Sequence, residues 1–158
     1  MIPNPPEEKV CSMIDVDNLF YVCSLIEYIG RERKLRRADV VAGLGEETVR
    51  RIYRHADVFH CEPIAKVADD FIALRSLPEG DFDNTGSCRY AVPSYWDIGA
   101  VYARLIEDVA DGADPVAKLL EVYASWMSDA LSRFNSDLFY QPRAYLAECY
   151  RAGEILAA

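Results

Sequence analysis

The chain has 158 residues, of which 51% are hydrophobic and 27% are charged, and its formal net charge is −9. This length and composition predict one folded domain with a real core and argue against a wholly disordered chain. An acidic protein repels nucleic-acid phosphates unless its cations are segregated, so nucleic acid is disfavoured as a partner. The sequence contains no apolar run of membrane-spanning length and no signal-peptide pattern at its start. Five cysteines without paired spacing predict reduced thiols in a cytoplasmic protein.

Helix start and stop signals predict an all-α fold that begins, after an extended arm over residues 1–11, with an N-terminal helical half over 15–75. Asp15 is expected to cap a helix that runs to about Lys34. Residues 19–29 of this helix are apolar on nearly all sides, so the helix should be central. Three further helices are predicted in this half, over residues 38–42, over residues 46–55, and after Glu62-Pro63.

The second half is predicted to begin with a capped helix over residues 94–110. Ser94 and Asp97 have the spacing of a capping box, and apolar residues recur at helical spacing behind them. One long loop, residues 77–92, precedes this helix; it carries turn signals, and residues 88–92 suit a short extended segment. Loops of this length are often functional or mobile.

A C-terminal helical hairpin should complete the domain. Its first helix is predicted from Asp114-Pro115 to Asn135, with Trp126 on the buried inner face, and its second helix follows Pro142. The whole chain, 1–158, is therefore predicted to be a single bundle of six or seven helices. Its second half, 94–157, would consist of a central helix and this hairpin.

Glu27 is the only charged residue in the apolar part of the first predicted helix. Such a carboxylate points to the rim of the core, pairs with an arginine, or lies in a pocket with a raised pKa. The sequence does not decide among these three placements. The pocket placement is the one that makes Glu27 a candidate site residue.

Residues 38–52 have the pattern of a helix-turn-helix, and basic residues are concentrated around it. Arg50, Arg51 and Arg54 on the second helix would meet phosphates or guanine in a DNA-binding protein. Two helices joined by a tight turn are also a common way to build any bundle. The acidic remainder of the chain favours this second interpretation.

A ribonuclease interpretation rests on Arg54 and His60, which fit the arginine–spacer–histidine pattern of metal-independent all-α ribonucleases. Arg54 would hold the scissile phosphate and His60 would move the 2′-hydroxyl proton. In those enzymes the motif usually lies late in the domain, whereas here it lies in the middle. A structural histidine is the competing interpretation.

No cofactor and no metal site are predicted. The histidines and cysteines lack the close-pair spacing of zinc sites. Residues 81–86 begin like a calcium-binding loop, but Val92 stands where the bidentate glutamate is required.

Residues 20–72 resemble a small bacterial helical family known only as a domain of unknown function. The resemblance is carried by five segments, Tyr21–Tyr28, Arg36–Val41, Ile52-Tyr53, Val58–His60 and Val67–Ile72. It implies a compact helical module, often encoded beside proteins similar to ADP-ribosyltransferases, with no activity assigned to it. The chain from Pro78 onward lies outside the resemblance.

The function that these patterns favour is a non-catalytic protein-interaction or regulatory module of the bacterial cytoplasm. Tyr95 and Trp96, at a helix start beside the long loop, form a candidate binding edge, and Arg36 and Arg37 are candidate rim charges. His60 is kept as a further candidate. The expected partner is another protein or a second copy of the chain.

Overall fold

The computed structural model describes residues 14–157, and these residues form nine α-helices and one short 3-10 helix, with no strand among them. In chain order the elements are α1 (Val16–Arg33), α2 (Arg37–Leu44), α3 (Glu46–Arg54), α4 (Ala56–Phe59), α5 (Ile64–Arg75), α6 (Tyr95–Ala110), α7 (Pro115–Ala124), α8 (Trp126–Leu131), η2 (Leu138–Tyr140) and α9 (Arg143–Ala152). The predicted all-α fold is confirmed. The arm expected over residues 1–11 lies outside the described residues.

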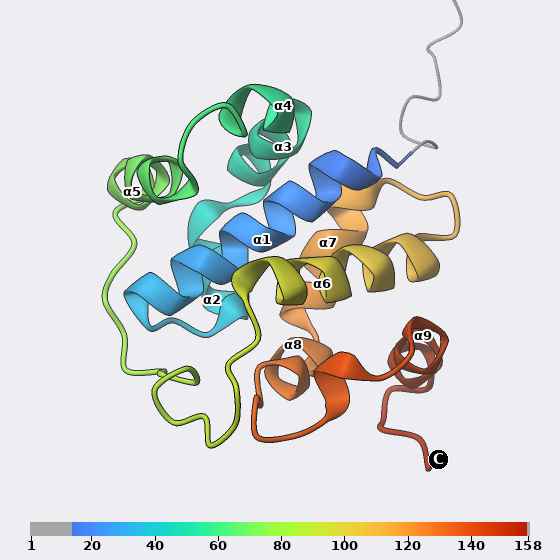
Figure 1. The fold of residues 1–158 in the computed structure, drawn as a ribbon. Helices are drawn as coiled ribbons and strands as arrows, with labels where there is room; N and C mark the ends of the chain where they lie inside the picture. The colour runs from blue at the N-terminus through green and yellow to red at the C-terminus, as the bar shows by residue number, and fades with distance from the viewer. Residues whose placement is uncertain (1–13, 158) are drawn as a thin grey trace, which may run out of the picture.

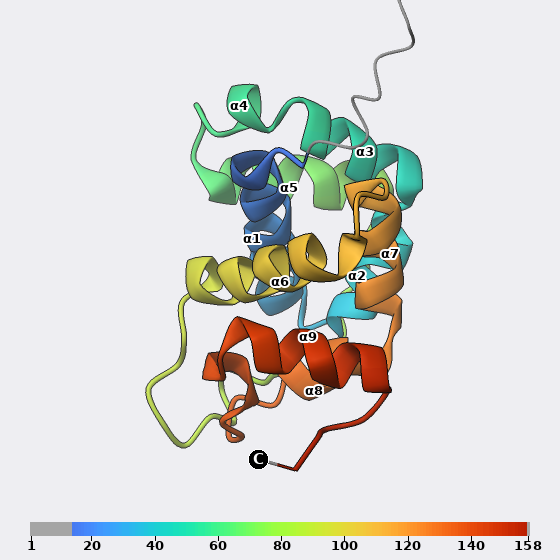
Figure 2. The same ribbon diagram turned by 90° about the vertical axis from the view of Figure 1, so that its right-hand side faces the viewer.

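Helix α1 is the central element, as its apolar sequence predicts. Its residues 21–27 are all buried, and α6 packs across it (Figures 1 and 2). In both views α3 and α4 lie on one side of this pair and α8 and α9 lie on the other. Asp15 caps α1 by accepting a hydrogen bond from the Asn18 amide at 3.0 Å.

Helix α6 begins where its capping box predicts. Ser94 Oγ accepts from the Asp97 amide at 3.0 Å, and the Asp97 carboxylate accepts from the Ser94 amide at 3.1 Å. One turn further, Gly99 is packed so closely on α1 that a Cβ built on it would lie 2.8 Å from the Cα of Ser24. The absence of a side chain at Gly99 therefore sets the close approach of the two central helices.

The structure has more helices than the six or seven predicted, for two reasons. Residues 56–59 form the extra short helix α4, and the single helix expected over 114–135 is interrupted at Ser125. Ser125 has an extended backbone, and its hydroxyl accepts from the Met127 amide at 3.2 Å, so it caps a new helix. Trp126 is consequently the first residue of α8 and only half-buried, whereas Met127 is fully buried. The prediction that Trp126 lies deep on a mid-helix face is wrong.

The long loop lies against the ends of α1 and α2 and against α8. It starts with backbone hydrogen bonds from Gly80 to the Arg33 carbonyl at 2.7 Å and from Phe82 to the Lys34 carbonyl at 2.9 Å. It consists of turns and irregular backbone, and the segment 88–92 does not form a strand. Asn84, near the middle of the loop, is 8% exposed and anchors the loop in the core.

Candidate functional site

Two oppositely charged side chains, Glu27 of α1 and Arg37 of α2, are buried together. Each is 1% exposed. Arg37 donates from Nε to Glu27 Oε1 and from Nη2 to Glu27 Oε2, both at 2.9 Å. This is the paired, two-bond geometry that makes an arginine–carboxylate contact strong. Arg37 also donates from Nη1 to the Leu35 carbonyl at 2.7 Å.

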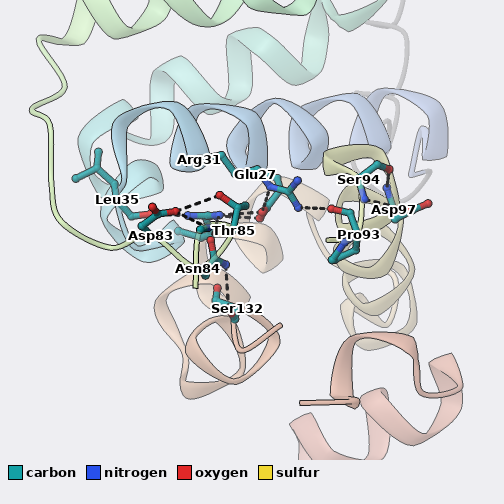
Figure 3. A network of polar contacts seen from close by, with 12 residues as sticks. Glu27, Arg31, Leu35, Asp83, Asn84, Thr85, Pro93, Ser94, Asp97 and Ser132 are labelled. Atoms are coloured by element: carbon teal, nitrogen blue, oxygen red, sulfur yellow. Dashed lines mark hydrogen bonds and ion pairs between the residues drawn. The ribbon is translucent and has the colours of Figure 1, made fainter. Parts of the chain in front are cut away.

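The pair extends into a network that holds the long loop (Figure 3). Arg31 donates to Glu27 Oε2 at 2.8 Å and to the Pro93 carbonyl at 2.7 Å. Asn84 accepts from Arg37 at 3.1 Å and donates to the Ser132 carbonyl at 2.9 Å. The network thus joins α1, α2, the middle and the C-terminal end of the loop, and the end of α8.

Opposing effects act on the pKa of Glu27. Burial alone raises it, but the hydrogen bonds and charges of Arg37 and Arg31 outweigh burial and hold the pKa below its ordinary value. Glu27 is therefore an ionised partner of arginines. It neither points to the rim of the core nor lies in a pocket with a raised pKa, so those two placements are wrong.

Only one of the two predicted rim arginines is on the surface. Arg36 is exposed and makes a two-bond contact to Asp129 of α8, at 3.1 and 2.6 Å. Arg37 is wholly enclosed in the network, so its assignment as a rim charge is wrong. Arg37 has to be buried because it is the main counter-charge of Glu27.

Tyr95 and Trp96 belong to a row of rings that crosses the start of α6, here called the aromatic strip and made up of Phe20, Tyr28, Tyr95, Trp96 and His60. Trp96 stacks on Phe20 with ring centroids 5.4 Å apart, and Tyr95 lies 5.0 Å from Trp96. Tyr95 meets Tyr28 edge to face at 5.2 Å. These four residues are half-buried, so each ring is fixed by its neighbours yet keeps a solvent-accessible part.

His60 closes one end of the aromatic strip. It is exposed, and its ring lies 6.0 Å from Trp96 and 5.5 Å from the buried Tyr21. The hydroxyl of Tyr21 is buried without a hydrogen-bond partner among the described residues. Burial, with a smaller effect from the Glu62 carboxylate, raises the pKa of Tyr21 to about 12.

Two carboxylates flank the other end of the aromatic strip. Glu32 lies one turn after Tyr28 on α1, and Asp69 lies on α5, which packs against α1. Partial burial and the Asp69 carboxylate raise the pKa of Glu32. Burial, followed by the charges of these two carboxylates, raises the pKa of Tyr28.

Two of the three arginines on the basic helix α3 are engaged in contacts within the chain. Arg50 pairs with Asp114 at 2.6 Å and with Glu46 at 3.2 Å, so its charge is neutralised within the chain. The Cζ atom of Arg51 lies over the ring of Phe71, 6.0 Å from the ring centroid. Arg54 remains exposed. The DNA-binding interpretation stays a prediction, with one guanidinium fewer to support it.

Arg54 and His60 of the ribonuclease interpretation are both exposed. Within residues 14–157 no hydrogen bond or ion pair joins them, and the contacts of His60 are to aromatic rings. That interpretation also stays a prediction.

Sequence reasoning overlooked Phe20, Tyr28, Glu32 and Asp69 as members of the site. Phe20 and Tyr28 looked like two more apolar residues of a central helix, and the strip appears only when α6 is placed across α1. The one signal in the sequence was the four-residue spacing of Tyr28 and Glu32, which places them on the same helix face.

No protein-family model, curated protein or solved structure matches this chain. The resemblance of residues 20–72 to a bacterial domain of unknown function therefore stays a prediction. Within the described part of the chain, no three His, Cys, Asp or Glu side chains gather in a way that would hold a metal ion. None of the helices between residues 14 and 157 has the length and hydrophobicity of a membrane span. The four cysteines in this range are free thiols.

Proposed function

We propose that this protein is a non-catalytic interaction module that binds a partner protein through the aromatic strip. The observation that carries the proposal is the half-buried row of contacting rings at the start of α6. Aromatic anchors that are held rigidly and remain partly exposed are the side chains that dominate protein interfaces. Val92, three residues before Tyr95 in the chain, is a further apolar residue with an exposed side, at 44% exposure.

The buried charges support a structural role for the rest of the site. Glu27 and Arg37 satisfy each other inside the core, where neither is accessible to a substrate. A second copy of the chain is a less favoured partner. The chain carries a net charge of −9, so two copies repel each other as they approach.

The test compares binding by the wild type and by the double variant Tyr95→Ala/Trp96→Ala. The immobilised wild type is used to capture proteins from the native host lysate, and each captured protein is then purified and titrated by calorimetry. We expect the double variant to lose about 2 kcal/mol or more of binding free energy, as at an interface hot spot. Tyr140→Ala is the matched control, because Tyr140 is 68% exposed in η2, outside the strip.

Circular dichroism and thermal unfolding must show that the double variant is folded. If it is not, Tyr28→Ala, which removes one half-buried ring of the strip, replaces it. Equal binding by wild type, strip variant and Tyr140→Ala would refute the proposed function. Sedimentation at increasing concentration separates a second copy from a different protein as the partner.

A further inference from the structure

A cleft lies where η2 and α9 pack against α6, on the side of α6 that Figure 2 shows facing α9. Its volume is about 390 Å³, which is in the range of small-molecule sites. The residues that line it include none of the five rings of the aromatic strip. An inference about this cleft therefore does not depend on the proposed function of the strip.

Most of the lining of the cleft is apolar. Val101 and Leu105 of α6, Leu146 of α9, and the rings of Phe139 and Tyr140 in η2 all contribute to it. The two rings meet edge to face with their centroids 4.8 Å apart, and Tyr140 is 68% exposed, so much of its ring is accessible to a ligand. This lining suits a flat apolar molecule.

Four charged or amide side chains also line the cleft, and three of them have partners within the chain. Asp97 is held in the capping box of α6. Gln141 donates from Nε2 to the Asp137 carbonyl at 3.3 Å. Arg143 binds both carboxylate oxygens of Asp108, from Nε at 2.9 Å and from Nη2 at 2.7 Å.

Arg104 is the fourth of these side chains, and its charge has no partner. Its backbone carbonyl accepts from Arg143 at 3.5 Å, but within residues 14–157 its exposed guanidinium forms no ion pair and donates no hydrogen bond. Arg104 follows Val101 by three positions, so the two share a face of α6. The cleft thus combines an apolar lining with one positive charge that the chain does not neutralise.

We propose that this cleft binds a small aromatic carboxylate, with its ring against the apolar lining and its carboxylate on Arg104. A guanidinium binds a carboxylate through two parallel hydrogen bonds, and Arg104 has both sets of donors available. An organic cation suits the cleft less well, because the unpaired charge in it is positive. The net charge of −9 repels anions from a distance, so binding depends on the contacts inside the cleft.

The probes are cinnamate and cinnamamide, which share a flat aromatic body and differ in charge. Each is titrated into the isotope-labelled protein, and the backbone amide chemical shifts give both the dissociation constant and the place of binding. We expect cinnamate to bind about tenfold more tightly than cinnamamide, as a charged hydrogen bond contributes. The shifted amides should lie on α6, η2 and α9.

Arginine variants test the role of Arg104. Arg104→Gln should weaken cinnamate binding about tenfold and change cinnamamide binding less than about twofold, because it removes only the charged contact. Arg54→Gln is the matched control: it makes the same change in net charge at an exposed position on α3, and it should alter cinnamate binding less than about twofold. Circular dichroism checks that both variants are folded.

A variant that fills the cleft keeps the test independent of charge. Ala100 is half-buried and lines the cleft, so Ala100→Leu places extra side-chain atoms where the probe would lie. It should weaken cinnamate and cinnamamide alike.

Several results would overturn the inference. These are the absence of any saturable shift with cinnamate, equal binding of cinnamate and cinnamamide, equal weakening by the two arginine variants, and shifted amides that lie away from α6, η2 and α9. None of them touches the proposed function, which the variant Tyr95→Ala/Trp96→Ala tests at other residues. Loss of partner binding in that variant together with any of these results would leave the proposed function standing alone.

Discussion

At the scale of single residues, the Glu27–Arg37 pair gives the largest expected effect on stability. Glu27→Gln keeps the size of the side chain but leaves the guanidinium of Arg37, 1% exposed, without its counter-charge. Breaking one side of a buried ion pair typically costs about 3–5 kcal/mol. We therefore expect a loss of that size in the free energy of unfolding, measured with urea at neutral pH. A loss below about 1 kcal/mol would contradict the buried-pair assignment.

The pH dependence of this effect follows from the pKa of Glu27. The pKa is lower in the folded protein than in the unfolded chain, so the unfolded state binds the proton more readily. The stabilisation from Glu27 is then fully present above its ordinary carboxyl pKa. It is lost as the pH falls through the lowered folded value. The difference in stability between wild type and Glu27→Gln should shrink over this acidic range and remain constant above it.

The pKa of Glu32 is shifted in the opposite direction from that of Glu27. Its raised pKa means that the folded protein holds a proton more readily than the unfolded chain, so ionisation of Glu32 near Asp69 weakens the folded state. Asp69→Asn should stabilise the protein by a few tenths of a kcal/mol at neutral pH, as removal of a like-charge contact does. The gain should disappear as the pH falls through the raised pKa of Glu32. Thermal unfolding across the acidic range measures this, and a gain that persists at low pH would contradict the contact.

Ser94 at the start of α6 offers a further test at a single residue. Ser94→Ala removes the hydroxyl that accepts from the Asp97 amide, and caps of this kind contribute about 1 kcal/mol. We expect this loss in urea unfolding. Ser94→Asp is the control, because its carboxylate can replace the cap, and it should retain most of the wild-type stability.

At the scale of elements, the crossing of α1 and α6 depends on Gly99. In most helix interiors Gly→Ala is stabilising, by about 1 kcal/mol. Here the added Cβ would lie 2.8 Å from the Cα of Ser24, a backbone atom that cannot move without its helix. We expect Gly99→Ala to destabilise the protein by about 1–3 kcal/mol, as overpacking does. A gain in stability would show that the two helices can separate at little cost.

The helices that the sequence predicts well are those with local signals at both ends. Asp15 and the Ser94–Asp97 capping box mark real helix starts, because a cap is made by residues a few positions apart. The break at Ser125 was missed because the apolar pattern continues across it. At Ser125 the side-chain cap starts a new helix even though the hydrophobic face continues through this position.

The candidate site was predictable only in part, for the same reason. Tyr95 and Trp96 are neighbours in the sequence at a recognisable helix start, so they could be found. Phe20 stacks on Trp96 from 76 positions away along the chain, and Tyr28 meets Tyr95 from another helix. Contacts of this range are set by how α1, α5 and α6 pack, which no local pattern encodes.

At the scale of the whole molecule, ion pairs and the buried network join the two halves of the chain. Arg36 binds Asp129 at 2.6 Å, and Arg50 binds Asp114 at 2.6 Å. Asn84 connects Arg37 of the first half to the Ser132 carbonyl of the second. The central crossing of α1 and α6 buries apolar side chains from both halves in one core. Neither half is expected to keep its structure when the other unfolds.

This coupling predicts a single cooperative unfolding transition, which the two tryptophans can test separately. Trp96 packs at the crossing of α1 and α6, whereas Trp126 begins α8 at the far end of the molecule. In single-tryptophan variants, Trp126→Phe and Trp96→Phe, urea unfolding followed by fluorescence should coincide with unfolding followed by far-ultraviolet circular dichroism. Asn84→Ala, added to each variant, should lower both midpoints together, because it removes a link that both halves share. If the Trp126 signal instead changes at lower urea than the Trp96 signal, the C-terminal hairpin is a separate folding unit and the single-domain prediction is wrong.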